Sequence, residues 1–302
     1  MRLFSRNPGG APANVLVMAG KLGAKTAFVG KVGSDPFGSF LKETLQNEGV
    51  DVSGMVVSQE VPTTLAFVQL DEKGDRTFSF YRNPGADVCL RADEVDETVL
   101  NQSRIFHFGS VSLTDEPSRT ATLESVKKAK KAGAVVSYDP NYRPALWREE
   151  SLAVREMTRA LELADIVKAS EEELSLLTGE SDLERGSRKL LERGPVLAVV
   201  TRGPKGAYYR TGRVCGSVST FDVPTVDTTG AGDAFWGALL SRLCGKKRED
   251  ISRMTREELE QAVVFANAAG SLATMKKGAI PSLPTREEIE ACVRETPRFA
   301  SV

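Results

Sequence analysis

Two kinds of hydrophobic pattern alternate along most of the chain. Short apolar runs, typical of strands buried on both faces, are separated by longer runs in which apolar residues recur with helical spacing. The expected strands are 105–108, 135–138, 166–169 and 196–201, and the expected helices among them are 117–132, 151–164, 171–177 and 182–193. This alternation predicts an α/β fold, with a parallel sheet and helices on both of its faces.

The pattern changes near the beginning of the chain. Two strand-like runs, 61–70 and 76–82, are joined by turn-forming residues at 71–75 and predict a β-hairpin, which suggests a small sheet apart from the main one. The other expected elements are a strand at 26–32, a hairpin at about 208–218, helices at 14–22, 39–48, 257–275 and 286–293, and a solvated charge run at 242–256.

A small-residue turn follows the extended residues 221–226. Gly230, Ala231 and Gly232 lead into a helix expected to begin at Ala231 or Gly232. The first N–H groups of a helix have no acceptor within it, and a turn without bulky side chains lets a phosphate approach them. Asp233 would repel a static anion but would suit a general base acting on an attacking hydroxyl. A carboxylate that stabilises the helix dipole explains Asp233 equally well from local chemistry alone.

Composition narrows the classes of function. The 302 residues can hold one large α/β domain with an appendage or two ordinary domains. The chain has 40 Lys and Arg residues against 41 Asp and Glu residues, which gives a net charge of −1. We therefore expect the protein to act on a small molecule rather than to bind nucleic acid or a membrane. Four scattered cysteines and one histidine argue against a zinc site or a disulfide framework. Without a long apolar run or a signal peptide, the protein is expected in the cytoplasm.

Several polar residues follow the expected strands, where ligands of open α/β sheets bind. Asp139 and Asn141 are expected to order such a site, and Arg143 is a candidate partner for phosphate. His107 is more simply a packed residue at a strand end than a catalyst. No segment matches GxxxxGK[ST], so phosphates must be held without a P-loop.

Two motifs resemble a known family. Residues 226–235 resemble the second signature of the ribokinase-like sugar kinases, the pfkB family, and residues 9–14 (Gly-Gly-Ala-Pro-Ala-Asn) resemble the first. From its chemistry alone, Asn14 could simply cap a helix. The resemblance covers nearly all of the chain. It implies a three-layer ribokinase-like fold with a mainly parallel central sheet, as one domain over 1–302 whose β-sheet lid is formed roughly by 1–10 and 56–84.

The implied activity is ATP-dependent phosphorylation of a sugar primary hydroxyl, with Mg²⁺ and K⁺ as the accompanying ions. Residues 80–87 and 139–147 are similar to those of fructokinases, so we expect fructose to be converted to fructose 6-phosphate. Kinases for ribose, 2-keto-3-deoxygluconate or a nucleoside are the alternatives. Lid sheets in this family often pair between subunits, which implies a homodimer.

The resemblance also implies roles for individual residues. Asp233 would be the base, with the backbone of Gly230, Ala231 and Gly232 stabilising the transferring phosphoryl group. The other implied contacts are Gly10, Asn14, Arg82 and Asp233 for the sugar; Lys168, Glu173, Thr201, Gly203, Gly206 and, near adenine, Asn267 for the nucleotide; Glu173 for magnesium through water; and Asp227, Thr229, Ala273, Gly278 and Ser282 for a monovalent cation.

The sequence departs from the family pattern in two places. Ser170 occupies the Asn position of the Asn-x-x-Glu motif that ends at Glu173, where acidic residues at a helix start are the simpler explanation. Family members usually have an earlier strand with a substrate-binding Asp, but only eight residues precede Gly9, so we expect this first strand to be missing. Its loss would leave a sugar- or nucleotide-binding protein with impaired catalysis as a further alternative.

Overall fold

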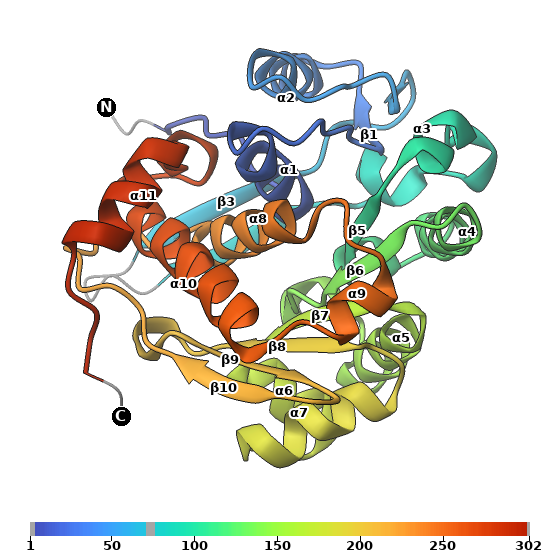
Figure 1. Ribbon diagram of the computed structural model, residues 1–302. Helices are drawn as coiled ribbons and strands as arrows, with labels where there is room; N and C mark the ends of the chain where they lie inside the picture. The colour runs from blue at the N-terminus through green and yellow to red at the C-terminus, as the bar shows by residue number, and fades with distance from the viewer. Residues whose placement is uncertain (1–3, 71–75, 301–302) are drawn as a thin grey trace.

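A six-stranded sheet forms the centre of the computed structural model, which describes residues 4–70 and 76–300 (Figure 1). The four strands from β5 to β8 run parallel, whereas β9 and β10 continue the sheet antiparallel. The strands of this sheet, in spatial order, are β10 (Cys215–Val218), β9 (Ala207–Thr211), β8 (Leu197–Thr201), β7 (Ile166–Ser170), β6 (Val135–Asp139) and β5 (Ile105–Gly109). The strands predicted from apolar runs are therefore confirmed, with ends that differ by about one residue.

Helices cover both faces of the sheet. Because successive side chains of a strand point to opposite faces, each strand contributes to two apolar cores. In β8, Leu197 and Val199 belong to one apolar core and Ala198 and Val200 to the other. The first core is closed by α1 (Ala11–Lys21), α8 (Ala231–Leu243), α10 (Arg256–Ala273) and α11 (Arg286–Glu295). The second is closed by α4 (Ser118–Lys131), α5 (Glu150–Leu163), α6 (Glu171–Thr178) and α7 (Leu183–Glu192). This arrangement is the predicted three-layer α/β fold.

Helix α1 begins three residues earlier than the apolar spacing predicted. Gly10, with φ 123°, turns the chain into the helix, and Pro12 lies in its first turn. Proline is tolerated there because the first N–H groups of a helix have no acceptor within it. Asn14 consequently lies one turn inside the helix, where it is buried and does not serve as the cap.

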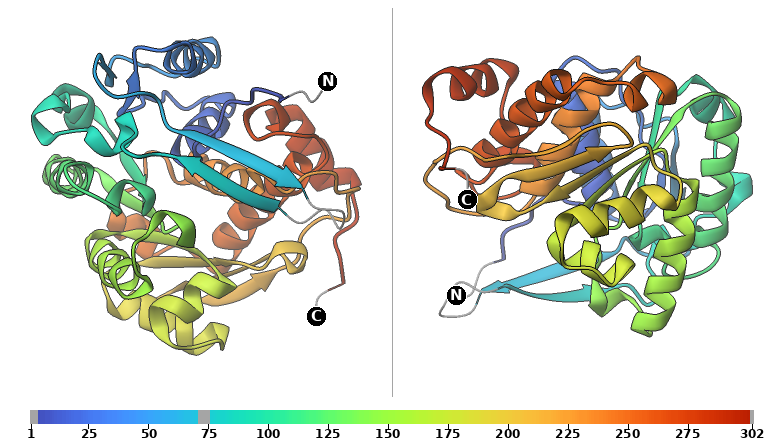
Figure 2. Two further views of the ribbon diagram at one scale, coloured as in Figure 1. Left: turned by 180° about the vertical axis from the view of Figure 1, so that it is seen from behind. Right: turned by 60° about the horizontal axis from the view of Figure 1, so that its bottom comes forward.

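Two small two-stranded sheets lie outside the central one. β1 (Gly30–Gly33) pairs in parallel with β2 (Met55–Ser58) beside α2 (Pro36–Asn47). β3 (Leu65–Leu70) and β4 (Arg76–Tyr81) form the predicted hairpin, which stands apart from the central sheet (Figure 2). Residues 56–58, at the start of the predicted lid range, belong to β2 and pair with β1 rather than with the hairpin. The predicted turn 71–75 lies outside the described residues.

Two short helices were not predicted, α3 (Glu97–Gln102) and α9 (Arg248–Ser252). The second falls in the charge run expected to be a solvated surface. That expectation is only partly correct, because Ile251 is fully buried and Arg248 pairs with Asp165 at 3.1 Å. No helix in the described part of the chain is both long and apolar enough to cross a membrane.

Candidate active site

The two signature motifs meet where α1 packs against α8. α8 begins at Ala231, as predicted, directly after Gly230, whose φ of 78° is left-handed. A Cβ on Gly230 would lie 2.9 Å from the Cβ of Ala279, so this turn requires glycine. In the first turn of α8, Asp233 Oδ2 accepts a hydrogen bond of 2.7 Å from Asn14 Nδ2, which is 219 positions away in the sequence.

The environment of Asp233 favours a base that works near neutral pH. Burial raises the pKa of Asp233 to about 6, against the opposing effects of the Asn14 hydrogen bond and the positive charge of Lys168. A carboxylate with this pKa is ionised at pH 7 and binds a proton more readily than an ordinary aspartate. The geometry and the pKa both favour a general base over a residue that only stabilises the helix dipole.

A buried ion pair lies beside this turn. Lys168, on β7, places its Nζ 2.5 Å from Asp139 Oδ2 at the end of β6, and both side chains are less than a tenth exposed. A Cβ on Gly232 would lie 3.5 Å from the Lys168 ammonium, so this cation faces the small-residue turn. Burial is the largest single effect and would lower the pKa of Lys168, but the combined attraction of Asp139, Glu173 and Asp233 raises it. A protonated lysine, paired with Asp139, therefore lies next to the turn.

The carboxylate of Glu173, at the start of α6, is held by two backbone segments. It accepts hydrogen bonds from the N–H groups of Tyr142 at 2.7 Å and Ser170 at 2.8 Å, and Ser170 Oγ caps the helix by accepting from Glu173 N. The serine found in place of asparagine thus works as the cap. Burial, followed by the charge of Asp139, raises the pKa of Glu173. Because both carboxylate oxygens already hold backbone groups, this carboxylate suits contact with a metal through water better than direct ligation.

Asp139 also fixes the loop that follows β6. Its Oδ1 accepts from the N–H of Asn141 at 3.2 Å, and Asn141 has a φ of 45°. This contact agrees with the predicted ordering role of both residues. Arg143 is exposed, and its Nη1 donates to Tyr142 O at 3.1 Å.

Three of the residues predicted for a monovalent cation come together. Asp227 Oδ1 accepts from Thr229 N at 2.8 Å, and Asp227 Oδ2 accepts from Gly278 N at 3.0 Å. Ser282 Oγ donates to Ala279 O nearby in the chain, and Ala273 is buried at the end of α10. Within the described residues no cluster of three or more His, Cys, Asp or Glu could hold a metal ion. Binding of a monovalent cation by these residues remains a prediction.

Four of the residues predicted for the nucleotide lie between β8 and α10, whereas Lys168 and Glu173 lie on β7 and α6. Gly203 and Gly206 form the turn after β8 with φ of 54° and 87°, and a Cβ on Gly206 would collide with Val218 O. Thr201 lies at the end of β8, where its Oγ1 is 3.4 Å from Ala169 O. Asn267 Nδ2 donates to Val218 O at 3.0 Å, so this amide ties α10 to β10. Nucleotide contact by these residues remains a prediction.

Arg82 attaches the β3–β4 hairpin to the turn after β5. Its guanidinium donates to Asp87 Oδ2 at 2.8 Å, Thr114 Oγ1 at 2.8 Å and Val111 O at 3.0 Å, and its side chain is only 5% exposed. In this structure the contacts of Arg82 are therefore with protein groups, and substrate contact by this residue remains a prediction.

No pattern in the sequence indicated the network around His107. The Nδ1 of His107 lies 2.9 Å from Ser137 Oγ, which also accepts a 2.9 Å hydrogen bond from Trp236 Nε1 in α8. Burial, and then the charge of Lys168, lowers the pKa of His107 to about 3. This neutral histidine packs between strand and helix, in agreement with the sequence-based interpretation.

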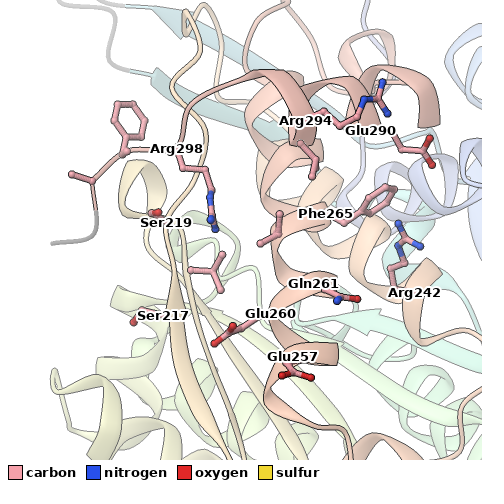
Figure 3. A pocket seen from close by; sticks show the side chains of 15 residues that line it. Ser217, Ser219, Arg242, Glu257, Glu260, Gln261, Phe265, Glu290, Arg294 and Arg298 are labelled. Atoms are coloured by element: carbon pink, nitrogen blue, oxygen red, sulfur yellow. The ribbon is translucent and has the colours of Figure 1, made fainter.

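A separate pocket lies elsewhere (Figure 3). It has a volume of about 900 Å³ between β10, α10 and the end of the chain. Its charged lining residues are three arginines and three glutamates: Arg242, Arg294, Arg298, Glu257, Glu260 and Glu290. Neither Asn14 nor Asp233 lines this pocket. We place the candidate active site at Asp233 and not at this pocket, because the two signature motifs and the Lys168–Asp139 ion pair meet at Asp233.

Residues 2–286 match the model of the pfkB family carbohydrate kinases, and the chain belongs to this family. The predicted family, the ribokinase-like fold and the class of enzyme, a carbohydrate kinase, are thereby confirmed.

Individual relatives are similar over nearly the whole chain. Fructokinase-1 of Zea mays is 46% identical over 287 residues, which cover 95% of this chain and 88% of that protein. A fructokinase from Xylella fastidiosa with bound ATP has a TM-score of 0.91 at 36% identity, covering 97% of this chain and 92% of that one. A fructokinase from Vibrio cholerae O395, with fructose, ADP and calcium ion bound, has a TM-score of 0.87 at 38% identity, covering 97% and 93%.

Proposed function

We propose that this protein is a fructokinase, which transfers the γ-phosphoryl group of ATP to the primary hydroxyl of fructose to form fructose 6-phosphate. The observation that carries the proposal is the contact of Asn14 with Asp233, a raised-pKa carboxylate at the glycine turn of α8. The similarity to fructokinases over nearly the whole chain supports fructose as the substrate.

In the proposed reaction Asp233 accepts the proton of the sugar hydroxyl as its oxygen attacks the γ-phosphorus. The bond from the γ-phosphorus to the bridging oxygen breaks, and ADP leaves with that electron pair. Backbone N–H groups at Gly230 to Asp233 stabilise the charge on the transferring group, because they are fixed before the reaction and require no reorganisation. The ammonium of Lys168 adds a positive charge at the same place.

Asn14 has two roles in this proposal. Its amide holds Asp233 in one orientation and, with the backbone of Gly10, contacts the sugar hydroxyls. Gly10 has no side chain and lies directly before α1, so a polyol can approach its backbone. Arg82 anchors the hairpin that covers the sugar.

Two ions belong to the proposal. Mg²⁺, bound to the ATP phosphates, would be oriented by Glu173 through water, and it would neutralise phosphate charge. A monovalent ion, K⁺, would bind at the loop of Asp227, Thr229 and Gly278, together with Ala273 and Ser282. The hydrogen bonds from Gly278 N and Thr229 N to Asp227 support this placement, because they hold the two loop segments together.

We propose further that the whole chain acts as one cytoplasmic kinase domain and forms a homodimer through its β3–β4 hairpin. Tyr81 is 68% exposed and Phe4 82%, and both rings pack edge-on against Phe67 at 5.3 and 5.5 Å between centroids. An exposed aromatic group of this kind suits a subunit contact. A monomer in analytical ultracentrifugation at micromolar concentration would rule out a stable dimer.

A coupled assay for ADP release tests the function. Fructose, ribose, 2-keto-3-deoxygluconate, adenosine and aminoimidazole riboside are compared with Mg²⁺ present, with and without K⁺. We expect the highest kcat/KM with fructose. Structural relatives include a putative ribokinase II and an aminoimidazole riboside kinase, so preferential turnover of a riboside would replace fructose as the substrate. ATP binding without turnover of any acceptor would favour a binding protein with impaired catalysis.

A further inference from the structure

A buried hydroxyl at the end of β5 has no hydrogen-bond partner in the described structure. Ser110 is 0% exposed, and its Oγ contacts no donor or acceptor. Its backbone is satisfied, because its N–H donates to Pro140 O at 3.1 Å and its carbonyl accepts from Leu113 N at 2.9 Å. A buried polar atom left unpaired lowers stability, so an unpaired hydroxyl requires an explanation.

Ser110 lies at the edge of the sheet where the catalytic groups gather. It directly follows Gly109, which lies level with Asp139 in the parallel pairing of β5 with β6. Asp139 holds Lys168 beside the glycine turn. On the face of the sheet, α1 packs against both β5 and α8 and brings Asn14 to Asp233.

Asn14 supplies a second polar atom of the same kind. Its Nδ2 donates to Asp233, but its Oδ1 is buried and has no partner. A hydroxyl and an amide carbonyl together offer one donor and several acceptor positions, which is the set that a polyol hydroxyl needs. Two buried polar atoms without partners thus lie on neighbouring elements, one on α1 beside the proposed base and one directly after β5, against which α1 packs.

The turn after Ser110 also contacts Arg82, which directly follows the β3–β4 hairpin. Arg82 donates to Val111 O and to Thr114 Oγ1, which lie one and four positions beyond Ser110. A ligand enclosed between the hairpin and the sheet would therefore be in contact with this turn.

We infer that Ser110 is a substrate-binding residue, whose hydroxyl hydrogen-bonds a ring hydroxyl of the sugar beside the Asn14 carbonyl. This inference rests on the proposed function, because it takes the ligand to be a sugar bound next to Asp233. It adds a specificity-determining contact to the residues that the motifs indicate.

Steady-state kinetics of Ser110→Ala tests the inference. Loss of one hydrogen bond should raise the KM for fructose by roughly 2- to 10-fold and leave the KM for ATP within about 2-fold. The melting temperature should stay the same or rise, because an unpaired buried hydroxyl is removed. Ser125→Ala is the matched control: Ser125 is buried within α4, and its Oγ donates to Ala121 O at 2.7 Å. This control should lower the melting temperature and leave both KM values unchanged.

Fructose analogues that each lack one hydroxyl identify the partner. The ratio of the Ser110→Ala KM to the wild-type KM should fall to 1 for one analogue only. An unchanged KM for fructose, a ratio that persists for every analogue, or an equal rise in both KM values with a lower melting temperature would each overturn the inference. Failure of the wild type to phosphorylate fructose would instead refute the proposed function, and Ser110 would then be tested by calorimetry with the sugar that the wild type binds.

Discussion

The buried carboxylate of Asp233 should reduce the stability of the protein while it supports the reaction. Its pKa rises from 3.8 to about 6 on folding. Each pKa unit corresponds to about 1.4 kcal/mol, so ionising this group in the folded state costs about 3 kcal/mol. Asp233 as a whole is only partly buried, so solvent screening reduces this cost to about 2 kcal/mol. Asp233→Asn removes the charge but keeps an oxygen that can accept from Asn14 Nδ2.

The pH dependence has a definite sign. Below pH 3.8 the carboxyl is protonated in both the folded and the unfolded protein, and wild type and variant should be equally stable. Between pH 3.8 and about 6 the folded protein binds more protons than the unfolded one, so the stability contributed by this group is lost as the pH rises. Above pH 6 the variant should therefore be more stable by about 2–3 kcal/mol, which corresponds to roughly 4–6 °C in melting temperature.

Two assays check this prediction together. Melting temperatures of the wild type and Asp233→Asn are compared at pH 5, 6, 7 and 8, and turnover with fructose is measured at each pH. Turnover of the variant should fall by at least about 10²-fold, and kcat/KM of the wild type should decline below pH 6. Asp96→Asn is the control, because Asp96 is an exposed cap of α3 where Asn serves equally well.

The reasoning would be refuted by a variant that is no more stable than the wild type at pH 8, since the buried charge would then carry no cost. Near-normal turnover of the variant would remove Asp233 from the proposed mechanism. A wild-type kcat/KM that stays flat down to pH 5 would contradict the raised pKa.

Two other predictions concern the groups beside Asp233. Lys168→Met leaves the buried carboxylate of Asp139 without its cation, so we expect the free energy of unfolding, measured with urea, to fall by about 3–5 kcal/mol. The double variant Lys168→Met/Asp139→Asn should recover most of that stability but not the turnover. Recovery of turnover in the double variant would exclude a catalytic role for the Lys168 charge. Glu173→Gln exchanges one carboxylate oxygen for a donor that opposes a backbone N–H, so the Mg²⁺ concentration for half-maximal activity should rise about 10-fold. Glu258→Gln, in the equivalent capping box of α10, is its control, and an equal Mg²⁺ response in both variants would argue against a magnesium role.

The sequence predicted the elements that depend on local patterns. The inner strands are apolar on both faces, so their bounds could be predicted to about one residue, and the glycine at position 230 indicated where α8 begins. The hairpin was predicted from its strand-like runs. Helix α9 was missed, because its single buried residue, Ile251, gives no periodicity within a charged run.

Contacts between distant elements could not be predicted from the residues alone. Lys168 and Asp139 lie at the ends of two strands, and only the spatial order of the sheet shows that these strands are neighbours. The capping role of Ser170 was likewise missed, because a three-residue spacing to Glu173 was interpreted through a family motif instead of a capping box. The unpaired hydroxyl of Ser110 is visible only when every buried polar atom can be matched with its partners.

The contact between Asn14 and Asp233 makes activity depend on nearly the entire chain. A ribosome releases α1 long before it reaches α8, which carries Asp233, the proposed base, and 219 positions separate the two residues. Fragments that end before α8 have the first signature but lack the proposed base, and fragments that begin after α1 have the proposed base without its hydrogen-bond donor. Catalysis in this architecture is therefore a property of the finished molecule, and a measured turnover also reports that both ends of the polypeptide have folded together.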